Sequence, residues 1–214
     1  MSDSSDQTTQ EPEAGRAELR RIAFLKAARD VFLEHGYEAA NMAEIVKRAG
    51  GSLSTLYSQF GGKRGLFEAM IDMRVNELTE QMQIELAAHA PLREGLRRIG
   101  EAFMTKMMSP ESLGVFRLMV GQAKNFPDVA DGYSRRSPER VRQALAEYLR
   151  DRAHAGEIRV ENFDVAAAVF FDLVRARLHF RAMLDASYVP SEADIREHVE
   201  RAVKVFVGGI EAIL

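Results

Sequence analysis

The segment NMAEIVKRAGGSLSTLYSQF, residues 41–60, contains the signals for two short helices separated by a tight turn. Asn41 is a favourable helix N-cap, and Glu44 follows three residues later at the acidic position of a capping box. The glycine pair at 50–51 ends this first helix, and Ser52 is the N-cap of a second one. Two short helices joined by a glycine-containing turn are typical of a helix-turn-helix.

A longer helix precedes this segment and another follows it. Apolar residues recur at helical spacing over residues 16–35, and Gly36 supplies the left-handed turn that ends the helix. After the glycine pair at 61–62, a long helix is expected over about residues 63–88. The sequence therefore predicts a three-helix domain over residues 15–62, which the long helix joins to the rest of the chain.

The remainder, residues 63–214, also has helical periodicity, and strand-type alternation is not sustained anywhere in it. Capping residues or prolines mark the expected helix starts at Ser109, Ser137, Asn162 and Ser191. Helices are expected over about residues 92–108, 110–125, 138–155, 163–184 and 191–213. The predicted fold class is all-α, with an N-terminal three-helix helix-turn-helix domain joined by a long helix to a larger helical domain.

Residues 1–14 are acidic and polar, with almost no apolar side chains, so we expect them to form a disordered acidic tail. An export signal would need a positively charged start followed by an apolar run, and a membrane span would need roughly 20 consecutive apolar residues. The sequence shows neither pattern. We therefore expect a cytoplasmic protein that has no membrane partner.

Enzyme chemistry is not indicated by any motif in the sequence. The chain has no cysteine, which excludes disulfides, thiolate metal sites and cysteine nucleophiles. It also lacks a nucleophile elbow, a phosphate-binding P-loop and a dinucleotide-binding glycine motif. The five histidines form no i, i+4 pair of the kind typical of zinc sites. We predict a protein that is not an enzyme and has no cofactor or metal.

Charge is distributed unevenly, although the formal net charge of the chain is only −3. Residues 16–70 carry nine basic and six acidic side chains, so this segment has three excess positive charges. The first 14 residues carry four acids and no base. An excess of positive charge on the helix-turn-helix segment favours binding to phosphates, but an excess of this size is also ordinary for a solvated surface.

Residues 21–70 resemble the signature of the TetR family of bacterial transcription regulators. The matching positions lie on both short helices and on the helices that flank them: Ala27, Ala28, Phe32, Gly36, Tyr37, Ile45, Ala49, Gly50, Ser52, Thr55, Leu56, Tyr57, Phe60, Lys63, Leu66 and Phe67. The resemblance implies a homodimer that binds double-stranded DNA and places its second short helix in the major groove.

The resemblance also implies which side chains contact DNA. Those expected at phosphates carry an amide, hydroxyl, phenol or ammonium group: Asn41, Thr55, Tyr57 and Lys63. Those expected at base edges are Leu53, Ser54, Ser58 and Gln59. Ser52 caps the helix that carries them. The alternatives are that Tyr57 is a half-buried core residue and that Ser52 is only a structural cap.

Two positions depart from the common pattern of the family. Gly51 stands where a branched apolar residue usually packs between the two short helices, and Ala40 replaces a frequent threonine. We therefore hypothesise that the helix-turn-helix is loose without DNA and becomes firm on binding.

The second part of the chain resembles the AefR-like subgroup, through the segments 116–120, 126–128 and 156–158. In such proteins the last two helices of each subunit form the dimer interface. The apolar side chains expected there are Val174, Leu178, Val199, Val203, Phe206, Val207 and Ile210. The alternative is that the final helix is simply buried within its own domain.

An effector pocket is expected among the middle helices, because flexible methionines and aromatic rings can line an adaptable apolar cavity. The expected lining residues are Phe103, Met104, Met107, Phe116, Met119, Arg175 and His179. Arg175 and His179 would suit an anionic effector, and the alternative for them is pairing at a surface or an interface. The alternative is that the apolar residues of this set are ordinary core.

These features predict a DNA-binding transcriptional regulator. We expect a repressor that leaves a pseudo-palindromic operator when a small-molecule effector binds. Two alternatives remain at this point: a helical protein-protein interaction module without DNA binding, and a transcriptional activator of the same fold.

Overall fold

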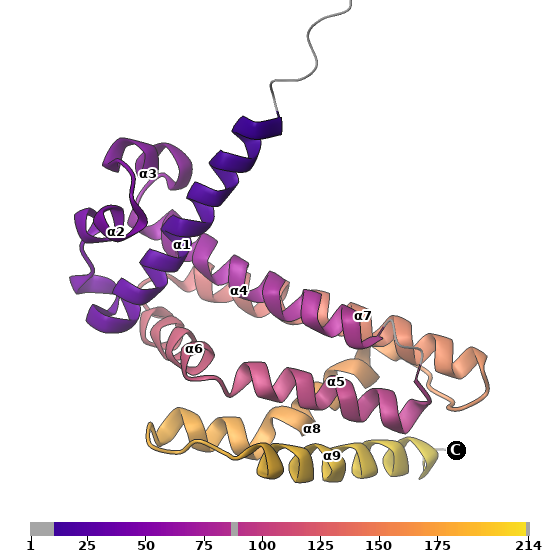
Figure 1. Cartoon of the computed structure of the whole chain (residues 1–214). Helices are drawn as coiled ribbons and strands as arrows, with labels where there is room; N and C mark the ends of the chain where they lie inside the picture. Colours follow the sequence, from indigo (N-terminus) through magenta and orange to yellow (C-terminus); the bar gives the residue numbers. More distant parts are fainter. Residues whose placement is uncertain (1–10, 87–89, 213–214) are drawn as a thin grey trace, which may run out of the picture. The chain divides into compact units, whose positions relative to one another are not determined.

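The computed structural model describes residues 11–86 and 90–212, and all regular elements in those ranges are helices (Figure 1). The nine helices found there are α1 (Glu11–Ala39), α2 (Met42–Ala49), α3 (Leu53–Phe60), α4 (Lys63–Leu86), α5 (Leu92–Met107), α6 (Pro110–Gln122), α7 (Pro127–His154), α8 (Phe163–Leu184) and α9 (Glu192–Ala212). The predicted all-α fold class is confirmed.

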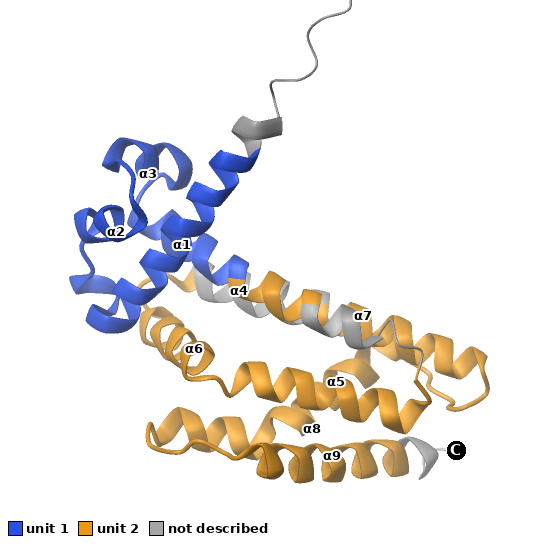
Figure 2. Cartoon of the chain, viewed as in Figure 1, with its two compact units in different colours: residues 1–73 blue, residues 74–214 orange. Residues whose placement is uncertain are grey.

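The chain divides into two compact units, Met1–Met73 and Arg74–Leu214 (Figure 2). The division falls within α4, so this helix contributes residues to both units. The domain boundary expected at residues 62–63 lies at the start of α4, before the division at residues 73–74, and stays a prediction. Most of the expected tail, residues 1–10, lies outside the described residues, and the proposed disorder of that tail stays a prediction.

The core of unit 1 is built from one buried face of each helix. Phe32 of α1 meets Phe67 of α4 edge to face, with ring centroids 5.4 Å apart, and Tyr37 stacks on Phe32 at 5.6 Å. The remaining fully or nearly buried side chains of this core include Phe24, Leu25, Ala28, Val31, Ile45, Leu56, Leu66 and Met70. Apolar residues that recur at helical spacing in the sequence thus form the core of unit 1.

The caps expected around the two short helices are present. The side chain of Asn41 accepts a hydrogen bond from the Ala43 N–H at 2.8 Å, and Ser52 accepts one from the Thr55 N–H at 3.0 Å. Gly50 ends α2 with φ 69°, a conformation that favours glycine. The Glu44 carboxylate binds Arg48 rather than the Asn41 backbone, so only half of the expected capping box forms.

Unit 2 is a helical bundle in which α8 packs against α5, α7 and α9. Phe170 and Val174 of α8 are fully buried, as is Val199 of α9. Helices α5 and α9 approach closely at Gly100, where an added Cβ would lie 2.7 Å from Cγ1 of Val199. The Ser191 and Asp194 capping box at the start of α9 is present, with both reciprocal hydrogen bonds formed.

Two helix starts differ from the expectation. Helix α1 begins at Glu11 rather than near residue 16, and α7 begins at Pro127 rather than at Pro138. Proline is favoured in the first helical turn, where its missing N–H would have no partner. The chain offers two such prolines, and the helix starts at the earlier one and continues through the later one. Among the described helices, none combines the length and the apolar character that a membrane crossing requires.

Gly51 has a packing role that the sequence did not indicate. A Cβ added at Gly51 would lie 2.6 Å from Cζ of Phe24, so the ring of Phe24 occupies the space that a side chain at residue 51 would need. The hypothesis that the helix-turn-helix is loose without DNA stays a prediction, although the ring of Phe24 fills the space beside Gly51. Arg20 also donates a hydrogen bond to the Gly50 carbonyl at 3.1 Å, which ties the turn to α1.

We expect Gly51→Val to destabilise the protein by about 1–3 kcal/mol, because the added side chain must displace the Phe24 ring from a filled core. Urea unfolding followed by circular dichroism measures the loss. Gly121→Ala is the matched control, since no heavy atom lies within 4 Å of the Cβ it adds and alanine favours the helix. An unchanged unfolding midpoint for Gly51→Val would show that Phe24 does not need this space.

Candidate nucleic-acid interface and effector cavity

Helix α3 is held on unit 1 by its own buried side. Leu56 is fully buried, and the ring of Phe60 packs edge to face on Phe24 with centroids 6.2 Å apart. The guanidinium group of Arg21 lies 5.3 Å above the centre of the Phe60 ring. These contacts fix the orientation of α3 on α1, so the opposite side of α3 has a defined direction.

The opposite side of α3 carries the residues expected at DNA. Leu53 is 44% exposed and Tyr57 is 49% exposed, and Ser54, Ser58 and Gln59 are also exposed. The Tyr57 ring lies beside Gly62, where an added Cβ would be 3.6 Å from Cε1 of Tyr57. This degree of exposure does not fit a core role for Tyr57. The exposed side of α3 is apolar at its start and rich in hydroxyl groups beyond it.

Three of the four residues expected at phosphates lie at helix starts: Asn41, Thr55 and Lys63. Asn41 is exposed, and its side-chain oxygen is engaged by the backbone of α2. Thr55 is half-buried, and its hydroxyl is 2.7 Å from that of Ser52. Lys63 donates a hydrogen bond to the Glu38 carbonyl at 2.7 Å, and its ammonium nitrogen is 5.0 Å from the centre of the Tyr37 ring. Lys63 therefore also joins the end of α1 to the start of α4.

The positive charge of unit 1 is partly neutralised within it. Arg48 of α2 forms two hydrogen bonds to Glu34, at 2.6 and 2.7 Å, and a further one to Glu44. Hydrogen bonding to Arg48 lowers the pKa of the Glu34 carboxyl, and the two carboxylates raise the pKa of Arg48. Arg16, Arg20 and Lys47 are exposed. The sequence analysis missed Arg20, which reaches the turn between the two short helices from a helix that is distant in sequence.

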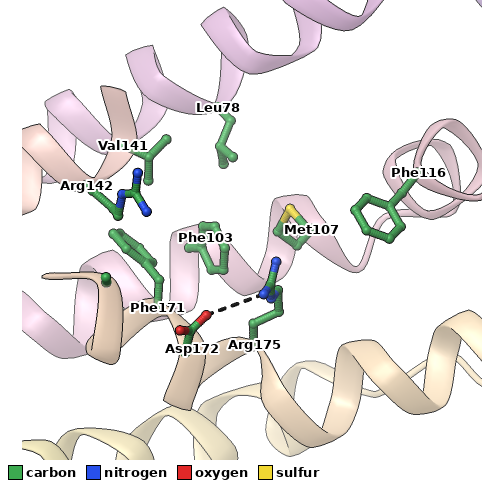
Figure 3. Close-up of a pocket in the computed structure, with 10 residues that line it drawn as sticks. Leu78, Phe103, Met107, Phe116, Val141, Arg142, Phe171, Asp172 and Arg175 are labelled. Carbon is green, nitrogen blue, oxygen red and sulfur yellow. Dashed lines mark hydrogen bonds and ion pairs between the residues drawn. The ribbon is translucent and has the colours of Figure 1, made fainter. Parts of the chain in front are cut away.

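A cavity of about 190 Å³ lies within unit 2 (Figure 3). Of the expected effector residues, Phe103, Met107, Phe116 and Arg175 line it. Met104 and Met119 are buried in the protein interior. The lining residues that the sequence analysis missed come from α4, α7 and α8: Leu78, Val141, Arg142, Ala168, Phe171 and Asp172.

His179 lies next to this cavity rather than in its wall. Its ring packs edge to face on Phe116, with centroids 5.1 Å apart. Burial, followed by the nearby positive charges of Arg175 and Arg117, lowers the pKa of His179 to about 4. The imidazole is therefore neutral at physiological pH. Within the described part of the chain, its buried Nε2 has no hydrogen-bond partner.

The apolar residues expected at a dimer interface pack inside the subunit. Six of them are at most 4% exposed: Val174, Leu178, Val199, Val203, Phe206 and Val207. The side chain of Ile210 lies outside the described residues. The stripe on α9 was wide because it covers the core of unit 2, which was the alternative interpretation. These side chains leave almost no surface for a partner.

The same two helices expose a different apolar set: Val165, Val169, Phe180, Leu184 and Val205. A groove of about 660 Å³ runs between the start of α8 and the end of α9. Val165, Val169 and Val205 line it, together with polar residues such as Arg159 and Glu161. Large exposed apolar side chains that lie together usually mark an interaction surface.

Comparison with known proteins gives matches for both units. Residues 24–70 match the family described as bacterial regulatory proteins, tetR family, and residues 94–209 match the family described as AefR-like transcriptional repressor, C-terminal domain. The HTH-type transcriptional repressor ComR of Escherichia coli is 27% identical over 143 residues, which cover 64% of this chain and 67% of ComR.

Solved structures share the fold. A crystal structure ascribed to the TetR family, from Mesorhizobium loti, superposes with a TM-score of 0.84 over 91% of this chain and 98% of its own, at 22% identity. The Flavonoid-responsive Regulator FrrA superposes with a TM-score of 0.70 at 25% identity, over 91% of this chain and 97% of its own. With a family model matching more than half of its length, this chain belongs to the TetR family of DNA-binding transcriptional regulators, a family of non-enzymes, and carries an AefR-like C-terminal domain.

Proposed function

We propose that this regulator is a homodimeric repressor that binds a pseudo-palindromic operator and is released from it by a small apolar effector. The observation that carries the DNA-binding part is the anchored helix α3, which buries Leu56 and exposes Leu53, Ser54, Tyr57 and Ser58. Base edges in the major groove offer hydrogen-bond partners to hydroxyl groups and an apolar surface at each thymine methyl group.

Two of the matches to known proteins support repression. ComR is named as a repressor, and the family of the C-terminal match is described as AefR-like repressors. A DNA operator as partner also assigns the protein to the cytoplasm. A repressor that blocks a promoter needs only to occupy its site. Its surface therefore does not need to contact RNA polymerase.

Dimer formation is supported by the exposed valines of α8 and α9. An isologous dimer buries the same patch on both subunits, and a patch that contains Val165, Val169 and Val205 would be desolvated on pairing. Two-fold symmetry then presents two copies of α3 to half-sites about one helical turn, ~34 Å, apart.

Effector release is supported by the cavity in unit 2, which has an apolar wall and a few polar groups, as small-molecule sites commonly do. Helix α4 contributes Leu66 and Phe67 to the core of unit 1 and Leu78 to the cavity wall. A ligand that displaces Leu78 therefore acts on a helix that the DNA-binding core also uses. A swing of the population from 1:99 to 99:1 requires a preference of about 5.5 kcal/mol for the released state.

We expect Lys63→Gln to weaken operator binding on all sequences and to reduce the dependence of log K on log salt by about one unit, because one phosphate contact loses its charge. Ser58→Ala should instead change which sequences are preferred. Fluorescence anisotropy at several salt concentrations, with oligonucleotides selected from a random pool, measures both effects. Glutamine retains a donor for the Glu38 carbonyl, and thermal unfolding checks that this contact is kept. A salt dependence equal to that of the parent protein would remove Lys63 from the interface.

We expect Val205→Glu to yield monomers and to lower operator affinity by about 100-fold or more, since each subunit then binds its half-site alone. The parent Val205 side chain is 61% exposed, so the change adds no charge to the core of the subunit. Sedimentation velocity and anisotropy provide the two measurements. Val120→Glu, at an exposed position of α6, is the control. A Val205→Glu protein that stays dimeric would place the interface elsewhere.

A further inference from the structure

The cavity of unit 2 combines aromatic walls with charged groups on one side. Phe103, Phe116 and Phe171 contribute rings, and Leu78 and Met107 add further apolar surface. The charged lining residues are Arg142 of α7 and Asp172 and Arg175 of α8. Figure 3 shows the guanidinium group of Arg175 pointing from α8 toward Met107 and Phe103.

The size of the cavity limits its ligand. A buried cavity of about 150 Å³ is known to hold benzene, and this one measures about 190 Å³. One ring with a short substituent fits this volume, and a long acyl chain does not. The three phenylalanine rings allow the edge-to-face and offset contacts that aromatic ligands prefer.

The guanidinium group of Arg175 has hydrogen-bond donors available for a ligand. Among the described residues, Arg175 forms one ion pair, a long contact of 3.4 Å to Asp172, and the Asp172 side chain is 72% exposed. Arg175 itself is 45% exposed, so its guanidinium group lies at the mouth of the cavity. A guanidinium group has five N–H donors and can bind a carboxylate through two of them. Arg142, in contrast, donates a hydrogen bond to Glu139 and forms an ion pair with it.

We propose that the effector is a compact aromatic carboxylate, whose ring lies against Phe103 and Phe171 and whose carboxylate binds Arg175 in place of Asp172. This proposal rests on the proposed function, because it names the class of effector that the cavity takes. Of the two lining arginines, Arg142 is paired with Glu139, so Arg175 is the cation that can attract an anionic ligand.

The protein interior next to the cavity is also unfavourable for a positive charge. His179, in contact with Phe116, is neutral, and the positive charges of Arg175 and Arg117 contribute to its lowered pKa. A cationic ligand would meet the same unfavourable potential. Asp172 is the one lining acid in this cavity, and it already binds Arg175 at the solvent side.

Isothermal titration calorimetry with three probes that share a phenylpropyl frame tests this inference: 3-phenylpropanoate, the isosteric 3-phenylpropanamide, and 3-phenylpropan-1-amine. We expect the carboxylate to bind the full-length protein about tenfold or more tighter than the amide, with the amine weakest, because a hydrogen-bonded charge pair stabilises only the anion. Arg175→Gln should abolish the preference for the carboxylate. Asp172→Asn should tighten carboxylate binding, since it removes the competitor for Arg175.

Arg177→Gln is the matched control, because Arg177 lies on the same helix but lines a different pocket. It should leave the carboxylate preference unchanged, and thermal unfolding without ligand checks that each variant is folded. Equal binding of amide and carboxylate, or a preference that survives Arg175→Gln, would overturn the inference. So would the failure of all three probes to bind.

The same samples separate this inference from the proposed function. The carboxylate could bind in a way that depends on Arg175 and yet leave operator affinity unchanged. That result would support the cavity as a ligand site but overturn its role as the effector site. If the protein binds no operator in the absence of ligand, the repressor proposal is overturned. The preference for the carboxylate in calorimetry is measured without DNA and does not depend on that result.

Discussion

The attachment of α3 to unit 1 through Leu56 is the constraint on which the DNA-binding side depends. Leu56 is fully buried, and Phe60 closes the end of the helix against Phe24. A helix of eight residues has little stability by itself, so this packing must keep it formed. Because burial fixes one side of α3, the hydroxyl groups on the other side are presented in a single orientation. The ring of Phe24, which contacts Phe60, also fills the space beside Gly51.

Much of unit 1 could be predicted from the sequence, since its signals are local. The caps at Asn41 and Ser52 satisfy N–H groups only two or three residues away, and the turns at Gly50 and Gly61 depend on their own positive φ. What the sequence could not supply were contacts between residues distant in the chain. The hydrogen bond from Arg20 to the Gly50 carbonyl spans 30 positions, and the role of Gly51 depends on Phe24.

Unit 2 was less predictable because its surfaces are decided by which helices meet. Apolar periodicity gives the inward side of α8 and α9 but does not say whether a neighbouring helix or a second subunit covers it. Val199 and Val203 proved to face their own core, and exposed valines such as Val205 lay off the main stripe. In the cavity, Phe103, Met107, Phe116 and Arg175 were found from composition, whereas Val141 and Phe171 required the packing of α7 on α8.

The distribution of charge in unit 1 gives dimer formation a physical reason. Three excess positive charges on residues 16–70 suggest a phosphate-binding surface, but Arg48 is held by two carboxylates and Lys63 is engaged by a carbonyl group. Within a single unit, residues 16–70 have a net excess of only three positive charges with which to displace counterions from DNA, and counterion release is the main source of affinity that does not depend on sequence. Two units on one symmetric site combine their contacts at a high effective concentration. In the proposed dimer, tight binding then depends on the pairing of subunits, and the proposed effector would remove it by changing the spacing of the two α3 helices, without altering any contact residue.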